Sequence, residues 1–458
     1  MQITKNLVEK CHSLSFSELP EEVVDRAKYL TLDYLGVAAR GSRSDSSIPV
    51  HRFVKRFENR DTGAIVVGTD LRIVASYAAI ANGSAAHSLE LDDVVNEASL
   101  HPAVAIMSAA LDAAHIAQCS GPDFLNGIVA GYEVMVRLGV ALDPSAHYAR
   151  GFHPTGTCGT MGSAITAAKI LGLNEEQMAN ALGIAGSLAS GSMEFMNDGA
   201  FTKRLHPGWA AHSGINAALL AREGFTGPTW IIEGKWGFLK AYSPMSDPEK
   251  VLKDWASPYK VMQTSIKPHS CCRYKQGPID GILEIMNKHQ LQASDIETVT
   301  IGILKTGMPL VAKPDEEKRN PKSVVDAQFS MPFGAAVAVL YGKASLDEYT
   351  EEKVAAPEIK DMMQKVFCVE DPSLENDFPR KWRASVKIAA KDGQNFSAEI
   401  EYPKGDPENP LSWEELTSKF KGLVGSVYSE ERIEQIVTEL RSLEMKKDFS
   451  SFSRSLAG

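Results

Sequence analysis

The spacing of apolar residues changes from a helical period to strict alternation near residue 265, and a helical period returns after residue 403. Val299, Ile301 and Ile303 alternate with other residues, which is typical of a strand with one buried face. Because helical patterns flank this region on both sides, the order predicts one domain inserted in another. The expected fold is mainly α with an α+β second domain: residues 1–266 and 404–458 form a large all-helical domain, and residues 267–403 form a smaller α+β domain.

Capping signals predict where several helices begin, because a short polar side chain can accept a hydrogen bond from a first-turn N–H. A proline followed by acids also suits a first turn, where the missing N–H costs nothing and negative charge favours the helix dipole. These starts lie at Pro20 (with Glu21 and Glu22, ending near Gly41), Asn174 (with Gln177), Ser412 (with Glu415) and Ser429.

Other local patterns are less specific. We expect one helix over 326–340, a helix that begins near Thr157, a hairpin turn at Asp392 and Gly393, and a loose tail over 449–458. Small residues are dense at 75–86, 159–169 and 183–191. They favour close helix–helix packing, although backbone lining a ligand cavity remains a second interpretation.

Composition excludes several classes of function. The 458 residues include 58 acidic and 48 basic ones, a net charge of −10, so neither nucleic acid nor a membrane surface is an expected partner. No uninterrupted apolar run is long enough to span a bilayer, and the first residues lack the pattern of a signal peptide or an Arg-rich transit helix. The six cysteines show no CxxC pair, which predicts free thiols in a cytoplasmic protein.

The common signatures of cofactor sites and nucleophilic enzymes are absent from the sequence. There is no GxxxxGK[ST] loop, no GxGxxG after a strand, no HExxH and no GxSxG. We therefore expect acid–base chemistry without a cofactor or metal.

The stretch from His87 to Pro102 crowds acids before a histidine. Glu90, Asp92 and Asp93 lie within four positions, and His101 follows. Because crowded carboxylates repel one another, one of them can hold a raised pKa and act as a general acid or base. The alternative is a solvated helix end.

Two later segments carry protonatable groups at helix starts. Tyr148 lies shortly before His153, which precedes a proline and a glycine-rich turn that leads into a helix. Backbone N–H groups at such a helix start attract carboxylates. Lys203, Arg204 and His206 form a basic spot that suits a multiply charged carboxylate. The alternatives are a histidine that stabilises its own turn and ordinary surface charge.

A fourth segment, SIKPHSCCRYKQ, lies at the expected domain junction. Lys267 and Arg273 are candidate carboxylate anchors, and Cys272 is a candidate binding residue. A nucleophilic cysteine is disfavoured because no third group is evident to orient a Cys–His pair.

Together these segments resemble the MmgE/PrpD family. The matching stretches are ELDD…HP (90–102), GFHPTGTCGT (151–160), KRLHPGWAAHSG (203–214), GFTGPTWIIEGKWGF (224–238) and KPHSCCRY (267–274). The resemblance implies a helical domain with an α+β lid, a homodimer, an active site between the domains and a small polycarboxylate substrate. It also implies that His101, His153 and Lys203 are catalytic. We expect substrate to be bound by Glu90, Asp93, Tyr148, Arg204, His206, Lys267, Cys272 and Arg273.

The reaction implied is removal of a proton beside a carboxylate, with either histidine as the base. A 2-methylcitrate dehydratase-like lyase is the main expectation. An iminodisuccinate-type epimerase and a cis-aconitate decarboxylase-like lyase are the alternatives, and a carboxylate-binding protein is the non-enzyme one. Two departures count against the decarboxylase: Glu90 and Val94 replace an aspartate and a threonine, and no lid tyrosine matches near Leu310 to Pro314.

Overall fold

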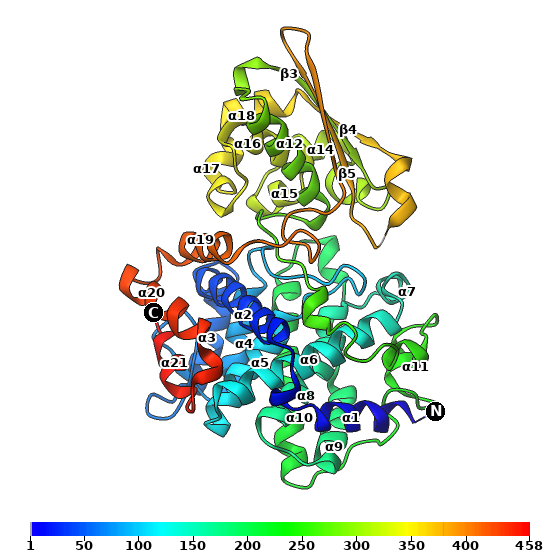
Figure 1. Ribbon diagram of the computed structural model, residues 1–458, viewed down its shortest axis with the longest axis vertical. Coiled ribbons are helices and arrows are strands. Elements are labelled where there is room, and N and C mark those ends of the chain that lie inside the picture. Colours follow the sequence, from blue (N-terminus) through cyan, green and yellow to red (C-terminus); the bar gives the residue numbers. More distant parts are fainter. Residues whose placement is uncertain (1, 379) are drawn as a thin grey trace. The chain divides into compact units, whose positions relative to one another are not determined.

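The computed structural model describes residues 2–378 and 380–458, which form two compact units (Figure 1). The helical unit comprises the chain up to Thr264 together with Ser412–Gly458, and the sheet unit comprises Ser265–Leu411. The chain therefore leaves the helical unit, forms the sheet unit and returns. The predicted fold class, mainly α with an α+β second domain, is confirmed.

The helical unit also contains one short two-stranded sheet, formed by β1 and β2. Its elements are α1 (Ile3–Ser13), α2 (Glu21–Gly41), α3 (Ser47–Val54), β1 (Ala64–Ile65), β2 (Arg72–Ile73), α4 (Ala75–Ala86), α5 (Ala103–Ala117), α6 (Gly121–Ala141), α7 (Pro144–Ala149), α8 (Pro154–Ile170), α9 (Glu175–Leu188), α10 (Thr202–Arg222), α11 (Phe238–Tyr242), α19 (Trp413–Val424), α20 (Glu430–Arg441) and α21 (Ser450–Ser455).

Helices α4, α5, α8 and α10 pack against one another in the core of this unit. Two glycines allow α4 and α10 to approach closely, since a Cβ on Gly83 of α4 would lie 2.6 Å from the backbone of Gly208 in α10. Only glycine fits such a contact. At this contact the small residues serve helix–helix packing, the first of the two interpretations.

Helix α6 is long and apolar enough to cross a membrane by length and composition, but 94% of its apolar window is buried inside the unit. It also carries a buried ion pair, in which Arg137 Nε donates to Glu133 Oε2 at 2.7 Å. Since both its faces contact protein, its apolar character is that of a core helix.

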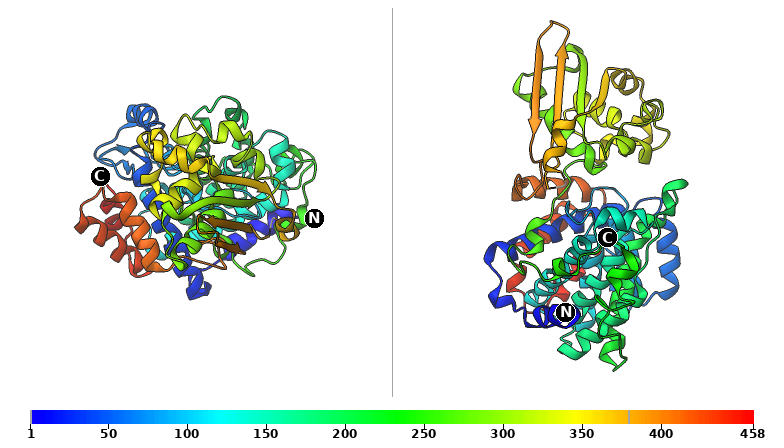
Figure 2. Two further views of the ribbon diagram at one scale, coloured as in Figure 1. Left: turned by 90° about the horizontal axis from the view of Figure 1, so that it is seen from above. Right: turned by 90° about the vertical axis from the view of Figure 1, so that its right-hand side faces the viewer.

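The sheet unit contains a four-stranded sheet in the order β4-β3-β5-β6, with helices against one face (Figure 2). Strands β3 and β4 are parallel and the other pairs are antiparallel. Its elements are α12 (Gln276–Lys288), β3 (Ile296–Ile303), α13 (Met308–Val311), α14 (Asp315–Lys318), α15 (Val324–Gln328), α16 (Met331–Tyr341), α17 (Glu351–Ala355), α18 (Pro357–Met363), β4 (Val366–Glu370), β5 (Ala384–Ala390) and β6 (Asn395–Ile400).

The predicted helix starts and the hairpin are confirmed. Helices α2, α9, α19 and α20 begin where their capping residues predict, and both capping boxes are formed. The hairpin joins β5 to β6 through Gly393, whose φ of +87° suits glycine.

Three local predictions are wrong. The helix expected over 326–340 is two helices, because Ser330 caps a new helix and Pro332 occupies its first turn. Helix α8 begins at Pro154 instead of near Thr157, again because proline suits a first turn. The tail is helix α21 instead of a loose end, since Phe449 stacks on Phe124 at 4.2 Å and Phe452 is fully buried.

Candidate functional site

Four histidines converge where helices of the helical unit begin or end. His87 directly follows α4, His101 precedes α5, His153 is the N-cap of α8, and His206 lies near the start of α10. The ring of His87 lies 5.1 Å from that of His101 and 5.7 Å from that of His153, which lies 5.3 Å from His206. Because these helices pack together, residues up to 119 positions apart form one cluster.

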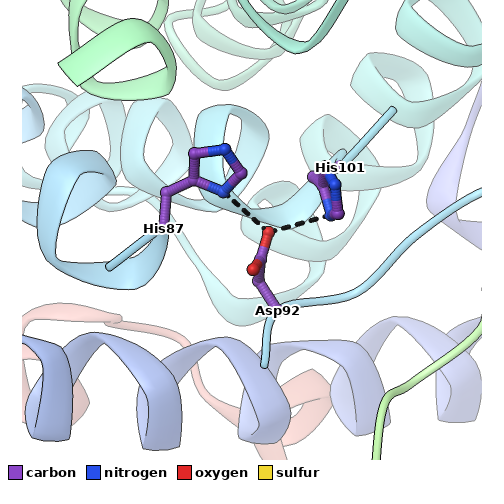
Figure 3. A group of neighbouring side chains, drawn as sticks. All are labelled: His87, Asp92 and His101. Atoms are coloured by element: carbon purple, nitrogen blue, oxygen red, sulfur yellow. Dashed lines mark hydrogen bonds and ion pairs between the residues drawn. The ribbon is translucent and has the colours of Figure 1, made fainter. Parts of the chain in front are cut away.

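Hydrogen bonds fix which nitrogen of His101 carries the proton. Its Nδ1 lies 2.6 Å from the carbonyl oxygen of Asp93 and 3.0 Å from a carboxylate oxygen of Asp92 (Figure 3). Both neighbours accept hydrogen bonds, so Nδ1 is assigned as the donor. The Nε2 atom then keeps its lone pair, which is the form of imidazole that accepts a proton.

His153 and His206 are a neutral pair. Their Nδ1 atoms lie 3.1 Å apart, so one donates and the other accepts. Burial lowers the pKa of His153 well below its usual value, helped by His87, His206 and Lys203. Burial, then His87 and Lys203, lowers the pKa of His206 to about 4. Both rings are therefore uncharged at neutral pH.

Lys203, in the first turn of α10, forms an ion pair with Glu90. Glu90 has a φ of +53°, a conformation that non-glycine residues seldom adopt. Arg204 follows Lys203 in the first turn of α10 and lies over the ring of Phe201 at 5.3 Å. Burial lowers the pKa of Arg204. The site thus contains an ammonium group whose partner is a carboxylate of this chain.

The acidic segment is buried, so the alternative of a solvated helix end is wrong. Asp93 accepts hydrogen bonds from the N–H of Ala103 at 3.0 Å and from the hydroxyl of Tyr132 at 2.8 Å. Burial raises the pKa of Asp93 to about 8. Tyr148 donates to the carbonyl of Ser99 at 2.9 Å and so ties α7 to this segment.

The family follows from comparison with known proteins. The MmgE/PrpD N-terminal domain matches residues 5–251, and the MmgE/PrpD C-terminal domain matches residues 269–443. The chain belongs to the MmgE/PrpD family.

Its similar relatives include enzymes with two different reactions. Cis-aconitate decarboxylase of Aspergillus terreus is 28% identical over 465 residues, which cover 96% of this chain and 94% of that protein. The cis-aconitate decarboxylase of Mus musculus is 28% identical over 470 residues, which cover 100% of this chain and 93% of that protein. The 2-methylcitrate dehydratase of Salmonella typhimurium is 24% identical over 260 residues, which cover 54% of this chain and 52% of that protein.

In this MmgE/PrpD protein, three predicted binding residues belong to the sheet unit. Lys267 and Cys272 are buried there, and Arg273 forms a buried ion pair with Asp406 and lies 5.5 Å from the ring of Trp382. Their role in binding substrate, and the location of the active site between the domains, stay predictions.

Sequence reasoning missed His87 and gave Asp92 no separate role. His87 Nδ1 lies 2.9 Å from the same oxygen of Asp92 that faces His101. The only signal in the sequence was a histidine five positions before an aspartate, a spacing that corresponds to no common motif.

Among the described residues, His87, Asp92 and His101 also form a group that could hold a metal ion. Their geometry fits hydrogen bonds better. His101 Nδ1 lies 2.6 Å from the Asp93 carbonyl, which accepts a hydrogen bond only from a protonated nitrogen. A protonated Nδ1 has no lone pair to give a metal.

Proposed function

We propose that this protein is a lyase that moves a proton at a carbon beside a carboxylate of a small di- or tricarboxylate. The observation that carries the proposal is the convergence of His101, His153 and Lys203 in one cluster, in which His153 is buried and the other two are partly exposed. A carbon acid needs a base and a cation that stabilises the enolate-like charge, and this cluster contains both. The names of the relatives, which concern cis-aconitate and 2-methylcitrate, support the substrate class.

The hydrogen bonds favour His101 over His153 as the base. Its Nδ1–H points at Asp92, whose negative charge stabilises the imidazolium that forms when Nε2 takes a proton. His153 lacks a carboxylate partner and has a strongly lowered pKa, so it suits a neutral hydrogen-bonding role. Lys203 would leave Glu90 to hold the substrate carboxylate and its enolate charge.

Dehydration and decarboxylation both develop negative charge on a carbon beside a carboxylate, so the same cluster can support either reaction. In dehydration, His101 takes the C–H proton, the C–O bond breaks as a double bond forms, and the proton leaves with the hydroxyl as water. In decarboxylation, the electrons of the broken C–C bond form the carbanion, and a protonated His101 or Lys203 returns a proton to it. Glu90 and Val94 count against the decarboxylase, whereas the two relatives named above that match over nearly the whole chain are decarboxylases, so decarboxylation is the second candidate.

The test is NMR of the purified protein in deuterated buffer with 2-methylcitrate, cis-aconitate and iminodisuccinate in turn. For dehydration we expect a new alkene and deuterium exchange at the substrate carbon. For decarboxylation we expect carbon dioxide and deuterium incorporated into the product. Exchange with inverted optical rotation and no loss of substrate would indicate the epimerase instead. His101→Gln and Lys203→Ala should abolish turnover, and ligand-induced thermal stabilisation without any exchange would replace the enzyme with a binding protein.

We also propose a cytoplasmic homodimer that needs no cofactor. A chain of ring contacts supports association: Phe57 stacks on Tyr77 at 3.7 Å, Tyr77 lies 4.9 Å from His212, and His212 lies 5.2 Å from Trp209. Phe53 extends the chain, and its exposed fraction is 43%. Trp209 is exposed as well, and the rings between it and Phe53 are partly buried. Grouped exposed aromatic side chains of this kind mark protein interfaces, and a second copy is the occupant that family resemblance favours.

A further inference from the structure

We propose that His87 and Asp92 are positioning residues that hold His101 with its Nε2 atom free to accept the substrate proton. This inference rests on the proposed function and extends it to two residues outside the predicted site. The side chains of all three lie together in the helical unit, between the end of α4 and the start of α5 (Figure 3).

One oxygen of Asp92 faces both imidazoles. The distance from this Oδ2 atom is 2.9 Å to His87 Nδ1 and 3.0 Å to His101 Nδ1. Both rings therefore present an Nδ1–H to the same carboxylate oxygen, because a carboxylate only accepts. Two donors on one oxygen fix its position, and the Asp93 carbonyl at 2.6 Å from His101 Nδ1 fixes the ring from a second direction.

The surroundings of His87 differ from those of a structural histidine. The side chain is fully buried, and its Nε2 atom has no hydrogen-bond partner among the described residues. Buried polar atoms nearly always have partners, and an unpaired one costs roughly 1–3 kcal/mol. His147 of the same unit is equally buried, but its two nitrogens meet the carbonyl of Tyr242 and the hydroxyl of Thr157, each at 3.0 Å.

The neutrality of His87 explains how it can help His101 without competing with it. Burial lowers the pKa of His87, although Asp92 acts in the opposite direction. A neutral imidazole donates one hydrogen bond and adds no positive charge, so Asp92 keeps its negative charge for the imidazolium of His101. The donated bond also weakens Asp92 as an acceptor for the Nδ1–H of His101, because two donors share one oxygen.

Other titratable groups reach the same cluster from neighbouring elements. They are Glu90 and Asp93 from the acidic segment, Lys203 and His206 from α10, His153 from α8, Asp33 from α2 and its partner Lys419 from α19.

Two substitutions at one position separate positioning from general stability. His87→Asn places an amide N–H where Nδ1 lies and keeps the donor, whereas His87→Leu removes it. In His87→Leu, Asp92 loses one donor and should bind the imidazolium of His101 more strongly. The acid limb of the pH profile of kcat/KM should therefore move to higher pH by about one unit, which corresponds to the free energy of one hydrogen bond to a charged group. In His87→Asn the acid limb should stay within roughly 0.3 units of the wild type, since the donor is kept.

Asp92→Asn tests the shared acceptor. The amide oxygen of Asn can still accept from both Nδ1–H groups, because both rings face the same oxygen, but Asn lacks the negative charge that stabilises the imidazolium of His101. Turnover should fall by about 100-fold or more, which is the range for a general base. His147→Leu is the matched control, because it removes an equally buried histidine outside the cluster: stability should fall while the acid limb stays in place.

Imidazole ¹⁵N NMR of the ligand-free protein tests the geometry without any substrate. We expect His87 and His101 as Nδ1–H tautomers in the wild type and His101 unchanged in His87→Asn, a variant chosen in case His87→Leu does not fold. An Nε2–H tautomer of His101, or equal acid limbs in the wild type and His87→Leu, would overturn the inference. Correct tautomers without turnover of any polycarboxylate would reject the proposed function alone.

Discussion

Removal of the Tyr132 hydroxyl tests whether Asp93 is a buried, protonatable acid. The hydroxyl donates to Asp93 at 2.8 Å, and both side chains are buried. Burial raises the pKa of Asp93 to about 8, so this carboxyl is mostly protonated at pH 7 and ionised at pH 9. A hydrogen bond between neutral groups contributes ~0.5–1.5 kcal/mol and one to a charged group ~1.5–3 kcal/mol. Tyr132→Phe should therefore lower the free energy of unfolding by about 1 kcal/mol at pH 7 and by about 2 kcal/mol at pH 9.

The sign of the pH dependence follows from the two pKa values of Asp93. In the unfolded chain an aspartate ionises near pH ~3.9, so the wild type loses stability as the pH rises from there to about 8. Above that pH both states are ionised and the contribution of Asp93 is constant. Tyr132→Phe removes a bond that favours the ionised form, which raises the pKa of Asp93 further. The variant should therefore keep losing stability where the wild type has levelled off.

Urea unfolding at pH 7 and pH 9, followed by circular dichroism and tryptophan fluorescence, measures both costs from the change in midpoint. The control is Tyr34→Phe, since Tyr34 is equally buried and its hydroxyl meets the neutral Ser108 Oγ at 2.8 Å. It should cost about 1 kcal/mol at both pH values. Equal costs for Tyr132→Phe at pH 7 and pH 9 would refute the assignment of a raised pKa to Asp93.

Three further results are expected. Because the pKa of His206 is lowered to about 4 in the folded state, stability should fall as the pH drops from about 6.5 towards 4, and His206→Asn should reduce this loss in urea titrations. Phe452→Ala should cost ~3–5 kcal/mol in urea unfolding, whereas Met445→Ala, at an exposed side chain, should change little; equal effects would mean that α21 does not pack as described. Trp209→Asp should convert a dimer to a folded monomer by light scattering, and an unchanged mass would exclude this aromatic surface as the interface.

Much of the fold could be predicted because its signals are local. A capping box needs only four consecutive positions, and the boxes at Asn174 and Ser412 formed as predicted. Alternation in β3 likewise needs only its own residues. The tail could not be predicted, because helix α21 is held by Phe124, which lies 325 positions before Phe449. The four serines of the segment suggest a loop only while the position of that phenylalanine is unknown.

The candidate site shows the same division between local and distant information. Its chemical groups are visible in the sequence, since His101, His153 and Lys203 stand out by residue type and setting. Their contacts depend on residues without functional groups, above all on the approach of α4 to α10 at Gly83 and Gly208. That approach brings the end of α4, and with it His87, close to the start of α10 and His206. The chemistry of the cluster was therefore predictable from its polar residues, whereas the part played by His87 depends on how closely two glycines allow the helices to pack.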